Sequence, residues 1–135
     1  MGRRTAGRLV TRRSFDIESM QHSNPIPAVT RLGPLVVSSV IASRDPGSTR
    51  VPDTIEGQLA NLFNHVGEML TAAGAGWEHI AKMTFYLPSL DLRAELNEPW
   101  VAHFPDPASR PARHTQIGAT PYAQCDFIAW VHGSP

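Results

Sequence analysis

Apolar side chains recur every three or four positions between residues 55 and 73, and this spacing predicts an amphipathic helix. Asp53 precedes the stripe as the expected N-cap, and Glu56 follows three residues later, as in a capping box. Gly74 and Gly76 end the pattern. The stripe should anchor the hydrophobic core, and its members are Ile55, Leu59, Leu62, Phe63, Val66, Met69, Leu70 and Ala73.

A second helix is predicted from Asp91, its expected cap, to about Phe104. Apolar residues recur in it every four positions, at Leu92, Leu96, Trp100 and Phe104. Pro99 falls inside this pattern, and a proline there should kink the helix or restart it.

Five segments have the composition and the alternation of β-strands. The first two form a hairpin around the turn Gly33-Pro34, and the third ends at Pro88. The segments are residues 28–32, 35–42, 79–87, 113–119 and 123–131. The order of elements is therefore ββαβαββ, which is typical of an α+β fold with both helices on one face of a single sheet. The other face would remain uncovered, which favours oligomerisation.

The last strand alternates between two kinds of side chain. Cys125, Phe127, Ala129 and Val131 should face the helices, so we interpret Cys125 as a small buried hydrophobic residue and not as a nucleophile. Gln124, Asp126, Ile128 and Trp130 should point the other way. A carboxylate among apolar strand residues is costly unless it is paired or functional, which makes Asp126 a candidate.

Charge is distributed unevenly, although the net charge is zero. From the first acidic residue, Asp16, onward, 7 basic residues stand against 12 acidic ones, and before it come Arg3, Arg4, Arg8, Arg12 and Arg13. We therefore divide the chain into a basic N-terminal arm, residues 1–20, and a single folded domain, residues 21–135. Such an arm can bind nucleic acid or a membrane surface, but it is more often dispensable, and zero net charge argues against a polyanion partner for the whole chain.

The run from Ser109 to Thr115 contains the strongest candidate for chemistry, Arg113. A guanidinium stays protonated near neutral pH and can hold a carboxylate through two parallel hydrogen bonds. The run therefore predicts a grip for a small anion, and the pattern leaves a surface ion pair open as the alternative. If Arg113 lies on the strand adjacent to the last one and opens onto the same cleft as Asp126, the two could pair or act together on a ligand.

Other chemistry finds little support in the sequence. The six histidines are dispersed without metal-ligand spacing, and we expect neither a metal site nor a cofactor. The single cysteine excludes an internal disulfide and fits a reducing compartment, and no apolar run approaches the roughly 20 residues that span a membrane. We therefore expect a cytoplasmic protein without a membrane partner.

Several short motifs occur in an order and spacing that are rather specific as a set. They are Gly33-Pro34-Leu35-Val36-Val37-Ser38-Ser39, Gln58, Ala73-Gly74, Asn97 with Trp100 and Phe104, and Arg110-Pro111-Ala112-Arg113. In these motifs the chain resembles the YjgF/Rid family over about residues 22–132. Members of that family are known as reactive-intermediate (enamine/imine) deaminases and, in older usage, as endoribonuclease L-PSP.

The resemblance implies a chorismate-mutase-like α+β fold and a homotrimer with clefts between its subunits. In such a cleft Arg113 would hold the carboxylate of the substrate, and groups at Ser38, Ser39 and Thr115 would line the same space. Asn97 belongs to the matched motifs, and we count it among the substrate-binding residues.

In the deaminases a glutamate of the last strand positions water. The register leaves either Gln124 or Asp126 facing as that glutamate would, and Asp126 is the only acid of the two. The resemblance thus assigns catalysis to Asp126 and Thr115 and gives Gln124 a role in substrate binding. Two stretches depart from the deaminase branch: Asn24–Ala28 lacks its tyrosine, and its Ser-Gly-Gln reads Ser38-Ser39-Val40.

Three functions follow as hypotheses. The first is hydrolysis of a small carboxylate-bearing enamine or imine to an oxo acid and ammonia. The second is a non-catalytic trimer that binds a small carboxylate metabolite, which the missing tyrosine favours. The third, ranked last because the body of the chain is acidic, is RNA binding or cleavage through the basic arm.

Overall fold

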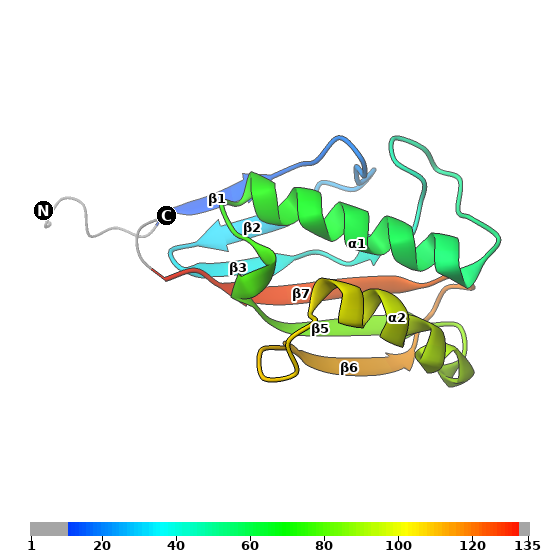
Figure 1. Cartoon of the computed structure of the whole chain (residues 1–135). Helices are drawn as coiled ribbons and strands as arrows, with labels where there is room; N and C mark the ends of the chain where they lie inside the picture. Colours follow the sequence, from blue (N-terminus) through cyan, green and yellow to red (C-terminus); the bar gives the residue numbers. More distant parts are fainter. Residues whose placement is uncertain (1–10, 133–135) are drawn as a thin grey trace, which may run out of the picture.

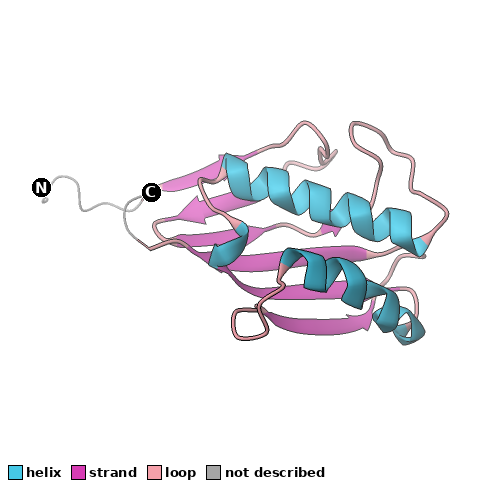
Figure 2. Ribbon diagram, viewed as in Figure 1, coloured by secondary structure: helices cyan, strands magenta, loops and turns pink. Residues whose placement is uncertain are grey.

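The computed structural model describes residues 11–132, which form one mixed β-sheet with two helices packed on the same face (Figures 1 and 2). This is the α+β fold that the sequence predicts. The strands lie in the order β1-β2-β3-β7-β5-β6, and the short β4 pairs with β7. The elements are β1 (Arg12–Phe15), β2 (Val29–Leu32), β3 (Leu35–Ser38), β4 (Ile41–Ala42), α1 (Ile55–Ala72), the 3₁₀ turn η1 (Trp77–His79), β5 (Ile80–Leu87), the 3₁₀ turn η2 (Leu90–Leu92), α2 (Arg93–His103), β6 (Ala112–Ile117) and β7 (Gln124–Trp130).

Strand β7 lies in the middle of the sheet, although it is the last strand of the chain. It pairs antiparallel with β3 on one side and with β5 on the other. Strands β5 and β6 are parallel, with α2 as their crossover connection. Strand β5 therefore separates β6 from β7, so the condition for joint action within one chain, that Arg113 and Asp126 lie on adjacent strands, is not met.

The core lies between α1, α2 and the sheet. Seven of the eight stripe residues of α1 are buried, and Ile55 is half-buried, which confirms the predicted amphipathic face. The sheet contributes two fully buried aromatic rings, Phe85 from β5 and Phe127 from β7. Each large apolar side chain removed from water contributes about 1.5–3 kcal/mol, so this layer dominates the stability of the fold.

The helix starts differ from those that the sequence predicts. The N-cap of α1 is Thr54, whose Oγ1 accepts a hydrogen bond from the Gly57 amide at 3.1 Å, and Asp53 is exposed. The segment after Pro88 begins as η2, where Ser89 Oγ accepts from the Asp91 amide, and α2 starts only at Arg93. Pro99 lies inside α2, which continues past it to His103.

The N-terminal segment contributes to the sheet. Residues 12–15, which the sequence analysis assigned to the basic arm, form β1 and pair with β2, and Ile17 and Met20 are buried. Arg3, Arg4 and Arg8 of that arm lie outside the described residues. The folded unit thus includes residues for which the sequence shows no sustained periodicity.

The two faces of the sheet have different surroundings. The helices cover one face, and the opposite face, called here the open face, carries no helix (Figure 2). Along β7 the helix-facing residues are buried, whereas Ile128 and Trp130 on the open face are 44% and 50% exposed. The register places Leu35 and Val37 of β3 beside them. The open face is therefore apolar at its centre, and it carries no helix, as the sequence predicts.

Candidate functional site

Arg113 and Thr115 lie on the helix-facing side of the edge strand β6. The register pairs Arg113 with Met83 and Thr115 with Phe85, and both partners are buried beneath the helices. Because β6 is the last strand of the sheet, α2 covers these two residues only in part, and both are half-buried. The strand thus holds the guanidinium of Arg113 at the rim of the core beside α2.

The guanidinium of Arg113 contacts two neutral side chains. Its Nη2 donates a hydrogen bond to Asn97 Oδ1 at 3.0 Å, and its Cζ lies 5.2 Å from the centre of the Trp100 ring. Partial burial, and then the positive charge of Arg93, lower the pKa of Arg113. No carboxylate lies within ion-pair distance of it in residues 11–132. The surface ion pair, the alternative left open by the sequence, is thus not formed in this part of the chain, and the remaining donors can hold an anion.

Asp126 lies on the open face, on the side of the sheet opposite to Arg113. Its neighbour across the β5–β7 ladder is Thr84, and the hydroxyl of Tyr86 donates a hydrogen bond to its Oδ2 at 2.7 Å. This bond to the carboxylate is the main reason why the pKa of Tyr86 is raised above its ordinary value. Within one chain, Arg113 and Asp126 therefore cannot act on one small ligand.

The hydroxyl groups of Ser38 and Ser39 hold the backbone at the end of β3. Ser38 Oγ accepts a hydrogen bond from the Phe127 amide at 3.0 Å, which continues the pairing with β7 beyond Val37. Ser39 Oγ donates to the carbonyl of Pro27 at 2.8 Å. The Ser39 amide also donates to the Ala28 carbonyl at 3.0 Å, and the predicted strand 35–42 is divided here into β3 and β4.

Ser39 and Gln124 line a pocket of about 450 Å³. We call it the Arg44 pocket, because Arg44 supplies its one permanent charge. Its other polar members are Gln21, His22 and Tyr122, and its apolar members are Met20, Ile26, Val40 and Ala42. Sequence reasoning found Ser39 and Gln124 but missed Arg44, His22 and Tyr122, because these residues come from distant segments and belong to no local motif.

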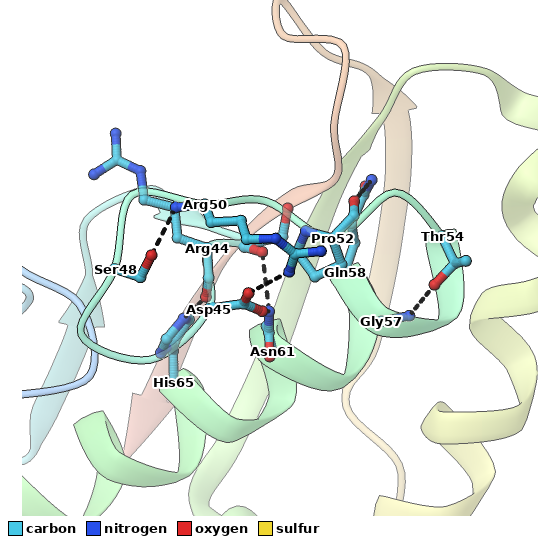
Figure 3. A network of polar contacts seen from close by, with 11 residues as sticks. Arg44, Asp45, Ser48, Arg50, Pro52, Thr54, Gly57, Gln58, Asn61 and His65 are labelled. Atoms are coloured by element: carbon cyan, nitrogen blue, oxygen red, sulfur yellow. Dashed lines mark hydrogen bonds and ion pairs between the residues drawn. The ribbon is translucent and has the colours of Figure 1, made fainter.

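Two buried polar side chains of α1 hold the walls of the Arg44 pocket (Figure 3). Gln58 accepts a hydrogen bond from the Ala123 amide through Oε1 at 2.9 Å and donates to the Pro52 carbonyl through Nε2 at 2.9 Å. His65 Nε2 lies 2.8 Å from the Arg44 carbonyl, and its Nδ1 lies 2.8 Å from Ser19 Oγ. Since a carbonyl only accepts, the proton of a neutral His65 is on Nε2, and Nδ1 accepts from the serine.

The loop that follows β4 is fixed to α1 by a small polar network (Figure 3). Arg50 Nη1 donates to Asp45 Oδ2 at 2.6 Å, and Asn61 Nδ2 donates to Asp45 Oδ1 at 2.9 Å. The bonds from Asn61 and then from Arg50 lower the pKa of Asp45. Asn61 Nδ2 also donates to the Ser43 carbonyl at 3.2 Å, so Asn61 of α1 holds both chain neighbours of Arg44.

Residues 11–132 show no arrangement typical of a metal site, a reactive cysteine or a membrane-spanning helix. No group of three or more His, Cys, Asp or Glu side chains lies together there as metal ligands would. Cys125 is completely buried, as predicted, and this burial raises the pKa of its thiol well above the ordinary value. No helix in the described part of the chain is long and apolar enough to cross a membrane.

The fold and the site together define a small α+β protein. At the edge of its sheet lies an arginine, Arg113, that forms no ion pair with a carboxylate of residues 11–132. The family model described as Endoribonuclease L-PSP matches residues 18–122. The chain therefore belongs to this family, the YjgF/Rid family, as its motifs indicate.

Relatives and solved structures agree with this assignment. The chain is 35% identical over 72 residues to Reactive Intermediate Deaminase A, chloroplastic, of Arabidopsis thaliana, a match that covers 53% of this chain but 37% of that protein. It is 32% identical over 91 residues to Protein mmf2, mitochondrial, of Schizosaccharomyces pombe, which covers 67% of this chain and 70% of that protein. The crystal structure of yeast Mmf1 superposes with a TM-score of 0.82 at 19% identity, over 90% of this chain and 99% of that one, and shows the shared fold.

Proposed function

We propose that the protein hydrolyses small enamines or imines that carry a carboxylate, releasing an oxo acid and ammonia, in a cleft between copies of the chain. The observation that carries the proposal is the state of Arg113: it is stacked on Trp100, bonded to a neutral amide and not paired with any carboxylate of residues 11–132. A guanidinium held in this way is ready to bind the carboxylate of a substrate.

The proposed site needs a second copy of the chain. Arg113, Asn97 and Thr115 form one half at the edge of the sheet, and the Arg44 pocket with Gln124 and nearby Asp126 forms the other half on a different side of the same chain. The exposed apolar centre of the open face supports association of copies, and membership of the Rid family supports a trimer. Each cleft would then combine Arg113 of one copy with Asp126 of the next.

The chemistry requires few groups. Arg113 fixes the carboxylate and so orients the neighbouring carbon–nitrogen bond. Tyr86 occupies Oδ2 of Asp126, which leaves Oδ1 free of hydrogen bonds within residues 11–132 to orient water toward the iminium carbon. An enamine first takes a proton from solvent on its methylene carbon and becomes the iminium ion. Water then adds to the iminium carbon, and one of its protons passes to the nitrogen. The carbon–nitrogen bond breaks, ammonia leaves, and the remaining hydroxyl proton returns to solvent as the carbonyl of the oxo acid forms. A tenfold gain in rate needs about 1.4 kcal/mol of transition-state stabilisation, which such contacts can supply.

The test is to generate 2-aminoacrylate in situ and to follow ammonia release. Arg113→Ala should lower kcat/KM about 10- to 100-fold, because a hydrogen bond to a charged group contributes about 1.5–3 kcal/mol. Arg113→Lys keeps the positive charge but loses the forked pair of N–H donors, so its kcat/KM should lie between those of wild type and Arg113→Ala. Arg50→Gln is the matched control, since Arg50 is already paired with Asp45. Equal rates for wild type and Arg113→Ala would remove the proposal.

A binding-only trimer is the second candidate. It is favoured by the hydrogen bond that already engages Asp126 and by the structural use of both serine hydroxyls. It predicts that carboxylate ligands raise the melting temperature of the protein while ammonia release stays at the uncatalysed rate. The buried Cys125 supports the cytoplasm, a reducing compartment, as the proposed location of either function.

A further inference from the structure

We infer that the Arg44 pocket binds a second anionic group of the substrate, so that the preferred substrates are enamines and imines of dicarboxylic acids. This inference rests on the proposed function and deepens it. Arg113 would hold the carboxylate beside the reacting carbon, and Arg44 of the neighbouring copy would hold the distal one.

The charge of the pocket is the first support. Arg44 contributes a permanent positive charge, and the pocket lining contains no carboxylate. Four other surface cavities of the described residues each contain at least one, from Asp16 with Glu68, Glu18, Glu78 with Asp106, and Asp16, and Arg44 also borders the one that contains Glu18. In a body with more acidic than basic residues, a cavity without a carboxylate and with an arginine attracts anions selectively.

The second support is that Arg44 is available. No ion pair of Arg44 is formed within residues 11–132, whereas Arg50, six positions further along the same loop, is committed to Asp45 at 2.6 Å (Figure 3). The backbone of Arg44 is fixed nevertheless, because its carbonyl lies 2.8 Å from His65 Nε2. A fixed backbone limits the entropy that the side chain loses when it binds a ligand.

The third support is the size and the remaining chemistry of the pocket. Its volume of about 450 Å³ lies within the usual range for small-molecule sites and far exceeds the methylene end of 2-aminoacrylate. Gln124, Tyr122 and Ser39 add neutral polar groups, and Ile26 and Val40 form an apolar rim that is 45% and 44% exposed. An apolar wall with a cation beyond it suits a short methylene chain that ends in a carboxylate.

The test compares two stable oxo acids of the product class, 2-oxoglutarate with two carboxylates and 2-oxobutyrate with one. Their Kd values are measured by isothermal titration calorimetry on the full-length wild type, Arg44→Gln, Arg50→Gln and Arg113→Ala. Wild type should bind 2-oxoglutarate at least about tenfold more tightly than 2-oxobutyrate, as expected for one more charge-assisted contact. Arg44→Gln should reduce the ratio of the two Kd values to near one, and Arg50→Gln should keep it.

Three results would overturn the inference. Wild type could show no preference, Arg44→Gln could keep it, or Arg113→Ala could leave the affinity for 2-oxoglutarate unchanged, which would make the pocket a separate site. The measurement needs no turnover. Failure of the ammonia assay with an intact preference would therefore count against the proposed enzyme and not against the specificity of the pocket.

Discussion

At the scale of single residues, Arg31 and Arg113 differ in the hydrogen-bond partners of their guanidinium groups. Arg31 is 3% exposed, and its guanidinium donates to the carbonyls of Gly33 at 2.9 Å and Ala73 at 2.9 Å. Ala73 is the C-cap of α1, so Arg31 satisfies a helix end and complements its dipole. Arg113 instead rests on an aromatic ring and a side-chain amide that commit few of its five donors. Arg31 is therefore a structural arginine, whereas Arg113 keeps donors for the ligand that we propose it binds.

The hydrogen bond between Tyr86 and Asp126 gives a prediction at the same scale. The pKa of Tyr86 is raised from its ordinary 10.0, chiefly by the bond to Asp126. Asp126→Asn removes the negative charge, so the Tyr86 pKa should move back toward the ordinary value. The chain has two tyrosines, and ultraviolet titration of phenolate in a Tyr122→Phe background isolates Tyr86.

The stability that this bond provides has a defined pH window. A folded-state pKa that is raised stabilises the fold fully below the ordinary tyrosine value of about 10, and the effect is lost as pH rises through the raised pKa. Tyr86→Phe should abolish this dependence in denaturation curves between neutral and alkaline pH. An unchanged phenolate titration in Asp126→Asn would contradict the bond itself.

At the scale of elements, α1 links the core to the candidate site. Its apolar stripe packs on the sheet. On the same buried side, Gln58 bonds the Ala123 amide, and His65 bonds the Arg44 carbonyl and the Ser19 hydroxyl. Substitution of Gln58 by Leu should leave the buried Ala123 amide without its acceptor. We expect a loss of about 1–3 kcal/mol in the free energy of unfolding, measured by urea denaturation.

Asn64→Leu on the same helix is the matched control. Asn64 is exposed, and its hydrogen bond to Glu68 at 3.3 Å is at the surface. This variant should change stability by no more than about 0.5 kcal/mol. Equal losses for both variants would show that the amide of Gln58 does not stabilise the pocket wall.

The elements were largely predictable from the sequence because each has a local cause. The stripe of α1 and the alternation of β7 follow from the periods of a helix and a strand. Where two side chains compete locally the prediction fails, as at the start of α1, where Thr54 caps in place of Asp53. β1 was missed because its residues are exposed or half-buried and show no alternation.

The arrangement of the site was less predictable. Alternation tells which residues of one strand share a face, but it does not tell which strands are neighbours. Strand β7 lies between β3 and β5, and the register places Arg113 and Asp126 on opposite faces of the sheet. No local sequence pattern predicts this strand order. The Arg44 pocket likewise joins segments around residues 20–26, 39–44 and 122–124, whose proximity exists only in the folded chain.

At the scale of the whole molecule, the open face explains why one chain is not sufficient for the proposed activity. The helices protect one face of the sheet (Figure 2). The other face exposes Leu32, Ile128 and Trp130 at 42%, 44% and 50%. Apolar side chains clustered in this way favour association. We expect the wild type to have about three times the 14.8 kDa mass of one chain in sedimentation experiments.

Trp130→Glu should shift this assembly toward the monomer, because it places a charge in the centre of the apolar surface that copies would share. If each active cleft combines Arg113 of one copy with Asp126 of another, ammonia release should decline in parallel with the trimer fraction, while circular dichroism stays that of the folded chain. Ile117→Glu is the matched control: Ile117 is 64% exposed, but its register with Leu87 places it on the helix side of the edge strand. A monomeric Trp130→Glu with full activity would show that the site is complete within one chain, and the opposite faces of Arg113 and Asp126 would then exclude Asp126 from catalysis.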